Sequence, residues 1–217
     1  MRRFRLTPRR VAVVLAATVG IGAGAAYAAT LSVGSWHLWA GSQTLTKATC
    51  TLQPSTTDTY VTQATPGGSN GSATTMLVRS NSGSADWSFV YFDLSSCAIP
   101  TTGGADTATL TLFITTAPGT SRTITVTPVL TSWTNSLTWT AAQSLSYGSA
   151  TTTFTTGTTN NTAKSATVTV DVDALIKNPS ASYGWRITDL GSGTATTSLA
   201  TVDAASNHPQ LVINYEK

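Results

Sequence analysis

Short runs in which threonine alternates with an apolar residue recur along most of the chain. Alternation with a period of two places one set of side chains in the interior and the other in water, so it predicts half-buried β-strands. Residues 107–112, 123–127 and 167–170 show it most clearly. Between turns rich in Gly, Pro and Asn, further strands are predicted at 58–64, 74–79, 87–94, 151–155, 184–188, 197–202 and 210–215.

One segment carries the signals of a helix instead. Residues 172–177 predict a short helix that packs Leu175 and Ile176 inward, with Asp171 or Asp173 at its N-terminus. About ten strands with one short helix predict an all-β protein. We expect a two-sheet antiparallel β-sandwich of jelly-roll type.

The first 28 residues differ from the rest of the chain. Five arginines precede an apolar run from Val11, which ends in the small-residue site Ala26-Tyr27-Ala28. This order predicts a secretory signal peptide, residues 1–28, and hence a secreted protein that is extracellular or associated with the cell surface. The alternative is an uncleaved membrane anchor, although three glycines interrupt the apolar run.

Cleavage would also reverse the net charge. The whole chain has 12 basic and 9 acidic residues, and five of the basic residues lie in the signal segment. The remaining seven basic and nine acidic residues give a net charge of −2. Because no Lys/Arg cluster is left, we expect no nucleic-acid partner, and after cleavage no membrane segment.

Two cysteines, Cys50 and Cys97, remain in the exported part. An oxidising compartment predicts a disulfide between them. A metal or redox pair is the alternative, but there is no C-x-x-C spacing and no histidine nearby. We expect Cys50 just before the first strand of the domain and Cys97 after the strand that ends at Leu94.

Residues 29–47 form a Gly- and Ser-rich arm ahead of the domain at 48–217, yet the arm contains Trp36, Leu38 and Trp39. Large apolar residues gain by burial, and the alternation of Trp36 with Leu38 is typical of a strand. Either the arm covers its own sheet, or it adds to the open edge of a neighbouring molecule and causes self-association.

Several motifs, in order, match a known family. They read DTYV at 58–61, PGGSNG at 66–71, FVYFDLSS at 89–96, ATLTL at 108–112, WTNSLTW at 133–139, VDVDALI at 170–176, YGWRITD at 183–189 and PQLVINY at 209–215. Together they resemble a DNRLRE domain, the module also classed as carbohydrate-binding module family 96. The resemblance implies an exported jelly-roll sandwich, and some members resemble binders of alginate or heteropolysaccharides.

This chain departs from the family pattern at three places. Tyr91 stands where a basic residue is usual, Asn135 stands where an acidic residue is usual, and no proline follows Trp139. The loss of a basic residue at Tyr91 removes one cation that would recognise an acidic polysaccharide.

Aromatic side chains stack on the apolar faces of sugars, which makes Trp87 and Tyr91 candidate ligand-binding residues. We expect these two to share a face of their strand and Phe89 to point the other way, the alternative being that the Trp87/Tyr91 face is buried. The core is expected to contain Trp133, Trp139 and Trp185.

The polar candidates do not favour an enzyme. Ser69 lies in a Gly-x-Ser-x-Gly string that Pro66 precedes and a strand follows, which predicts a turn and not a nucleophile elbow. The predicted mature chain has a single glutamate, Glu216, and no evident carboxylate pair for glycoside hydrolysis. Asp58 and Asn70 offer hard oxygen ligands for a structural Ca²⁺, with an ion-free turn as the alternative.

The sequence therefore predicts a secreted, non-catalytic carbohydrate-binding or cell-surface β-sandwich module. Its expected partner is a polysaccharide or another glycan of the cell envelope. The alternative is a structural subunit of an extracellular matrix, coat or filament. Exposed aromatics around a groove would favour the first function, and a flat threonine-covered face with an open edge strand would favour the second.

Overall fold

The computed structural model describes residues 30–33, 36–39, 45–81, 83–179 and 182–217. The chain divides into two units, Met1–Leu45 and Thr46–Lys217. In the first unit β1 (Thr30–Val33) pairs antiparallel with β2 (Trp36–Trp39), so Trp36 and Leu38 do belong to a strand. The predicted signal peptide, 1–28, lies outside the described residues, and self-association through the arm stays a prediction.

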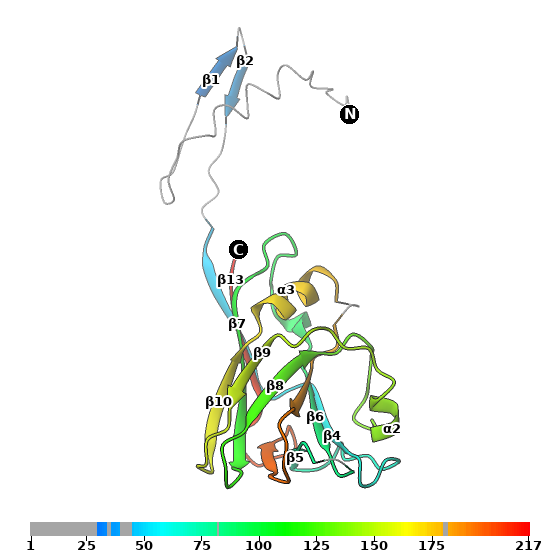
Figure 1. Ribbon diagram of the computed structural model, residues 1–217. Coiled ribbons are helices and arrows are strands. Elements are labelled where there is room, and N and C mark those ends of the chain that lie inside the picture. Colours follow the sequence, from blue (N-terminus) through cyan, green and yellow to red (C-terminus); the bar gives the residue numbers. More distant parts are fainter. Residues whose placement is uncertain (1–29, 34–35, 40–44, 82, 180–181) are drawn as a thin grey trace. The chain divides into compact units, whose positions relative to one another are not determined.

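The second unit is built from two antiparallel sheets (Figure 1). The six-stranded sheet has the order β3 (Lys47–Leu52), β13 (Gln210–Glu216), β7 (Ala105–Thr116), β12 (Thr197–Ala200) and β5 (Thr75–Val78), and β10 (Thr162–Thr167) also pairs with β7. The five-stranded sheet has the order β4 (Thr57–Thr62), β6 (Asp86–Tyr91), β11 (Trp185–Asp189), β8 (Thr123–Pro128) and β9 (Thr152–Thr155). The predicted two-sheet sandwich is confirmed.

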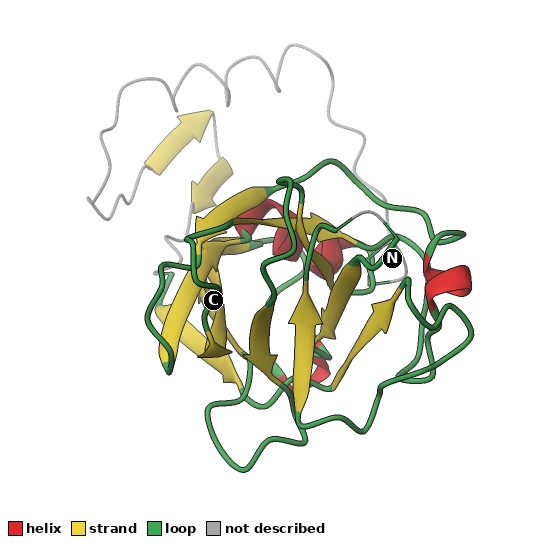
Figure 2. Ribbon diagram, turned by 60° about the horizontal axis from the view of Figure 1, so that its bottom comes forward, coloured by secondary structure: helices red, strands yellow, loops and turns green. Residues whose placement is uncertain are grey.

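The core lies between the two sheets, and the strands form the layers that enclose it (Figure 2). Alternate apolar residues of each strand point into it, for example Ile124 and Val126 of β8 and Leu110 and Leu112 of β7. All four are at most 1% exposed. Burial of each such side chain contributes about 1.5–3 kcal/mol, so the threonine–apolar alternation accounts for the fold.

The strand predicted at 167–170 is wrong. Strand β10 ends at Thr167, and the helix α3 spans Thr169–Lys177, three residues earlier than predicted. Val168 and Val172, four residues apart, are both fully buried, whereas Val170 is 73% exposed. The valine alternation therefore imitates a strand, but the packing selects helical spacing.

Neither aspartate caps this helix at its N-terminus. The N-cap is Val168, which makes no side-chain capping bond, and Asp173 accepts instead from the backbone N–H of Ala105 at 2.6 Å. Leu175 and Ile176 are buried, as predicted.

The described residues contain more helix than predicted. A one-turn helix, α2 (Trp139–Ala142), lies beside β4 and β6, and a 3₁₀ turn, η1 (Leu94–Ser96), follows β6 (Figure 1). The Thr138 hydroxyl caps α2 by accepting from the backbone N–H of Ala141 at 3.2 Å. In the described part of the chain, none of the helices has the length and hydropathy needed to cross a bilayer.

The Cys50–Cys97 disulfide is present, with a Cα separation of 5.7 Å. Cys50 lies inside β3, not before the first strand, and pairs there with Ile213 of β13. Cys97 closes the η1 turn. The bridge thus ties the edge strand of the six-stranded sheet to the loop that leaves the five-stranded sheet.

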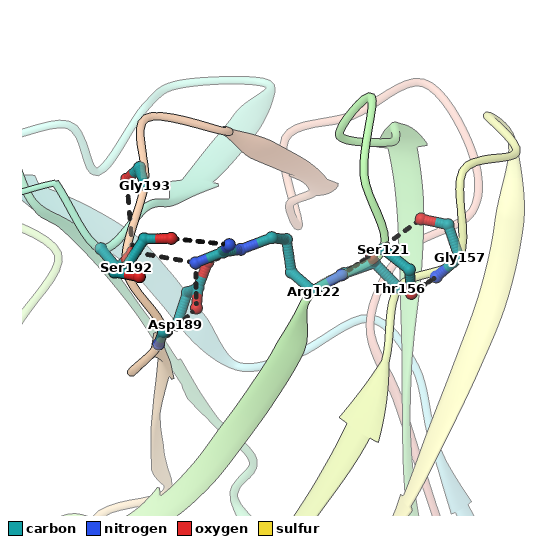
Figure 3. A network of polar contacts seen from close by, with 9 residues as sticks. Ser121, Arg122, Thr156, Gly157, Asp189, Ser192 and Gly193 are labelled. Atoms are coloured by element: carbon teal, nitrogen blue, oxygen red, sulfur yellow. Dashed lines mark hydrogen bonds and ion pairs between the residues drawn. The ribbon is translucent and has the colours of Figure 1, made fainter.

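A second tie joins three loops around Arg122 (Figure 3). Its guanidinium donates to both carboxylate oxygens of Asp189, at 2.6 and 3.1 Å, and to the carbonyl of Ser192 at 2.9 Å. It also donates to the hydroxyl of Ser80 at 3.1 Å. This bidentate pair fixes the start of β8 against the end of β11.

Two further aspartates, Asp58 and Asp171, are buried and accept hydrogen bonds from neutral donors. Asp171 accepts from Trp185 Nε1 and from the Thr151 hydroxyl, each at 2.7 Å. Asp58 accepts from the Ser55 hydroxyl at 2.6 Å and from the backbone N–H of Val202 at 2.7 Å. In each case burial raises the pKa of the carboxyl, and these hydrogen bonds only partly oppose the rise.

These raised pKa values predict an unusual pH dependence of stability. A carboxyl whose pKa is raised by folding binds its proton more tightly in the folded state, so stability increases as the pH falls through the folded pKa. We expect the free energy of unfolding, measured by urea denaturation, to rise as the pH is lowered from neutrality toward 3.8, the ordinary pKa of an aspartate. Asp171→Asn should flatten that rise, and the exposed control Asp106→Asn should not. A slope that is the same in both variants would contradict this account.

Candidate functional site

A second apolar cluster lies on the outer face of the five-stranded sheet. Val61 of β4 and Phe89 of β6 are fully buried in it, although their strand neighbours Tyr60 and Val90 belong to the main core. The segment that follows β8 covers this face with Leu137, Trp139 and Ala142.

The prediction that Phe89 points away from the face shared by Trp87 and Tyr91 is wrong. Residues two apart on a strand point the same way, so Trp87, Phe89 and Tyr91 all lie on the outer face. Phe89 is fully buried there because Trp133 packs on it, with ring centroids 5.6 Å apart. Trp87 and Tyr91 are half-buried on either side of it along the strand.

Arg186 is the charged residue of this face. It pairs with Phe89 of β6 and Thr127 of β8, in the middle of the sheet. Its guanidinium carbon lies 3.8 Å from the centroid of the Tyr147 ring and 4.7 Å from that of the Trp87 ring. Cation–π contacts of this kind orient the guanidinium and contribute about 0.5–2 kcal/mol. We call Trp87, Tyr147 and Arg186 the outer-face site.

Gly184 sets the orientation of Arg186. Its φ is +80°, and a β-carbon there would lie 2.1 Å from the carbonyl oxygen of Val90. Only glycine allows β11 to start this close to β6. From that start Trp185 turns inward to Asp171 and Arg186 turns outward.

Two pairings bring the aromatic residues over the arginine. Tyr147 forms a β-bridge with Val129, next to the Gly148 N–H that donates to the Pro128 carbonyl at 3.0 Å. Trp139 begins α2 and packs on Trp87, with ring centroids 4.4 Å apart.

Arg186 forms no ion pair with an acidic residue in the part of the chain that the structure describes. Among the described residues the ion pairs are Arg79–Asp86 and Arg122–Asp189, and neither includes Arg186. Its Nε is buried and makes no hydrogen bond. Burial lowers the pKa of the guanidinium, partly offset by Tyr147, but arginine stays charged at neutral pH. The outer-face site is therefore a positive charge framed by two aromatic rings.

Three other tryptophans, Trp133, Trp139 and Trp185, were predicted to lie in the core. Trp139 and Trp185 are 5% and 1% exposed, which confirms them as core residues. Trp133 is half-buried, and its Nε1 donates to the Tyr183 carbonyl at 2.7 Å.

The structure does not bring Asp58 and Asn70 to a shared partner. Asp58 is 2% exposed and accepts from Ser55 and Val202, whereas the Asn70 amide donates to the Tyr60 carbonyl at 3.0 Å. The described residues contain no group of three or more His, Cys, Asp or Glu that could hold a metal ion. Calcium at this corner stays a prediction.

Ser69 lies in the loop between β4 and β5, with a turn on either side, and not between a strand and a helix. The Gly68 N–H donates to the Thr65 carbonyl at 2.9 Å. A β-carbon on Gly71 would lie 2.2 Å from the Asn135 carbonyl oxygen, so the glycine permits close packing of this turn on the 133–139 segment.

Sequence reasoning missed Arg186 and Tyr147. A signal for Arg186 was present, because it alternates with the inward residues Trp185 and Ile187 and so must face outward. No local pattern links Tyr147 to Arg186, since the contact depends on how the 130–148 segment folds over the sheet.

The fold and site define a β-sandwich binding module with a charged aromatic site on one sheet. Residues 48–215 match the family model of carbohydrate-binding module family 96, and the chain belongs to that family. No curated protein is significantly similar to it.

One solved structure with a detectable likeness is the CBM22-1–GH10 modules of Clostridium thermocellum endo-1,4-β-D-xylanase 10B, complexed with xylohexaose. It is 11% identical, with a TM-score of 0.27, over 77% of this chain and 25% of that chain. This chain thus spans about a quarter of the length of that xylanase structure.

Proposed function

We propose that this protein is a secreted, non-catalytic module that binds an acidic polysaccharide through the outer-face site. Membership of a carbohydrate-binding family supports the ligand class. The N-terminal sequence 1–28 and the Cys50–Cys97 disulfide support a location outside the cytoplasm.

The observation that carries the proposal is the state of Arg186. The Arg186 guanidinium is half-buried and has no carboxylate partner in the described structure, so it is able to donate hydrogen bonds to an anionic group of a ligand. A uronic-acid carboxylate matches the planar fork of arginine with two parallel hydrogen bonds. Trp87 and Tyr147 are only half-buried, so the exposed part of each ring could contact the C–H groups of a sugar bound beside Arg186. Arg186 thereby supplies the cation that is missing at Tyr91.

The same geometry argues against catalysis at this site. Glycoside hydrolysis needs two carboxyl groups about 5–10 Å apart around the scissile bond. The side chains that make up the outer-face site are a cation and two aromatic residues. They can hold and orient a sugar, but they supply neither a general acid nor a base.

Arg186→Gln tests the proposal. A hydrogen bond to a charged group is worth about 1.5–3 kcal/mol, so affinity for polygalacturonate should fall roughly 10- to 100-fold. Isothermal titration calorimetry measures it, with neutral β-1,4-xylan as the comparison polymer. Lys177→Gln is the matched control, since it removes one positive charge from an exposed position at the end of α3.

Two results would contradict the proposal. One is a wild-type protein that binds neither polygalacturonate nor alginate. The other is an equal loss of affinity in Arg186→Gln and Lys177→Gln, because a general charge effect would then explain the binding.

A further inference from the structure

A cleft of about 210 Å³ opens at the end of the sandwich, between the η1 turn and the end of α3. Its apolar lining includes Leu94, Leu175, Ile176 and Pro179. Two residues with polar side chains, Tyr91 at the end of β6 and Asp93 after it, also line the cleft.

Tyr91 therefore belongs to a different place from Trp87. The two residues share a strand face, but Phe89 lies between them with Trp133 packed on it. Trp87 contacts Arg186 and Trp139, whereas Tyr91 lines the end cleft. The two aromatic residues that the sequence pairs as one binding surface are thus parts of two separate surfaces.

The polar groups of the cleft suit a donor-bearing ligand. Asp93 accepts from the backbone N–H and from the hydroxyl of Ser95, each at 2.9 Å. A carboxylate has about four acceptor positions, so about two are left for a ligand. Burial, with the nearby Asp93 second, raises the pKa of Tyr91, so its hydroxyl stays protonated and can donate or accept.

Size and charge narrow the ligand further. Sites for drug-sized molecules measure about 300–1,000 Å³, so a cleft of about 210 Å³ accommodates roughly one sugar ring. A pyranose combines an apolar face, which matches the leucine, isoleucine and proline lining, with hydroxyl donors, which match Asp93. The carboxylate repels an acidic sugar, whereas Arg186 attracts one.

The η1 wall of the cleft is held in place by hydrogen bonds and by the disulfide. The Thr56 hydroxyl accepts from the Asp93 backbone N–H at 2.7 Å, and the Leu94 carbonyl accepts from the Cys97 N–H at 2.9 Å. The disulfide ties Cys97 to β3. A preorganised site loses less conformational entropy on binding.

We propose that this end cleft is a second carbohydrate site, which binds a single neutral pyranose residue through Tyr91 and Asp93. The protein then has two sites that prefer sugars of different charge. The outer-face site takes an acidic residue, and the end cleft takes a neutral one. This inference rests on the proposed carbohydrate-binding function for its ligand class, but not on Arg186.

The test uses the methyl β-glycosides of glucose, mannose and xylose, with methyl β-glucuronoside as the acidic probe. Each is titrated into the ¹⁵N-labelled protein while the backbone amide signals of Ser95, Cys97 and Ile176 are followed. A neutral glycoside should shift these signals in a saturable way, and the glucuronoside should not. Asp93→Asn and Tyr91→Ala should each lower the affinity for the neutral glycoside at least about tenfold.

The variants separate this proposal from the first one. Asparagine caps a helical turn as well as aspartate does, so Asp93→Asn keeps the η1 turn while it removes the charge. Arg186→Gln should leave the neutral-sugar shifts unchanged. Neutral glycosides that leave the cleft signals unshifted would overturn the second site, as would shifts that survive in both cleft variants. Retained binding of polygalacturonate would leave the outer-face site standing in either case.

Discussion

Joint replacement of Cys50 and Cys97 by serine should lower the free energy of unfolding by about 4 kcal/mol. The bridge closes a loop across a sequence separation of 47 residues, and the chain-entropy model gives about that value for a loop of this length. In this model the loss is large because the unfolded chain regains the conformational freedom of a long loop. The edge strand β3 and the turn after β6 are both held by this bond.

Urea denaturation with and without reductant measures the effect. The wild type should lose stability when the reductant is added, and the double serine variant should give the same curve in both conditions. A difference between oxidised wild type and variant below about 1 kcal/mol would show that hydrogen bonds alone hold β3 in place.

Asp189→Asn should have the second largest effect on stability and lower the free energy of unfolding by about 3 kcal/mol. The Asp189 side chain is 1% exposed and its partner Arg122 is 14% exposed, so the pair is largely shielded from water. Loss of one partner of a buried pair typically costs about 3–5 kcal/mol, because the other charge stays buried and unpaired. We take the lower value because Arg122 retains some solvent contact and its bonds to Ser192 and Ser80.

A double-mutant cycle isolates the pair. Arg122→Met, Asp189→Asn and the double variant are compared by urea denaturation, with Asp106→Asn as an exposed charge control. The double variant should be less destabilised than the sum of the two single changes, since neither charge is then stranded. Additive single effects would show that the two side chains act independently.

The residues of the two candidate sites could be predicted from the sequence only in part. Trp87 and Tyr91 were identified from their residue type and their strand. The prediction that Phe89 points away was an error in applying the strand period, which puts all three on one face. That Trp133 divides this face could not be predicted, because it depends on the path of the 130–148 segment over the sheet.

The sequence by itself determined the elements whose pattern is local. Threonine–apolar alternation located most of the strands, the pair of cysteines identified the disulfide, and the neighbours of Trp185 placed it in the core. Each of these follows from the periodicity of a short segment or from the chemistry of one residue type.

The tertiary structure alone decided three features. Val168 and Val172 make 169–177 a helix only because β7 and the core lie beneath them. Tyr147 contacts Arg186 although the two are about 40 residues apart in the sequence. Tyr91 lines one cleft with residues of α3 that follow it by more than 80 positions. The reason is the same in each case: contacts between distant segments depend on which sheet faces pack together, and the local alternation of residues carries no information about that choice.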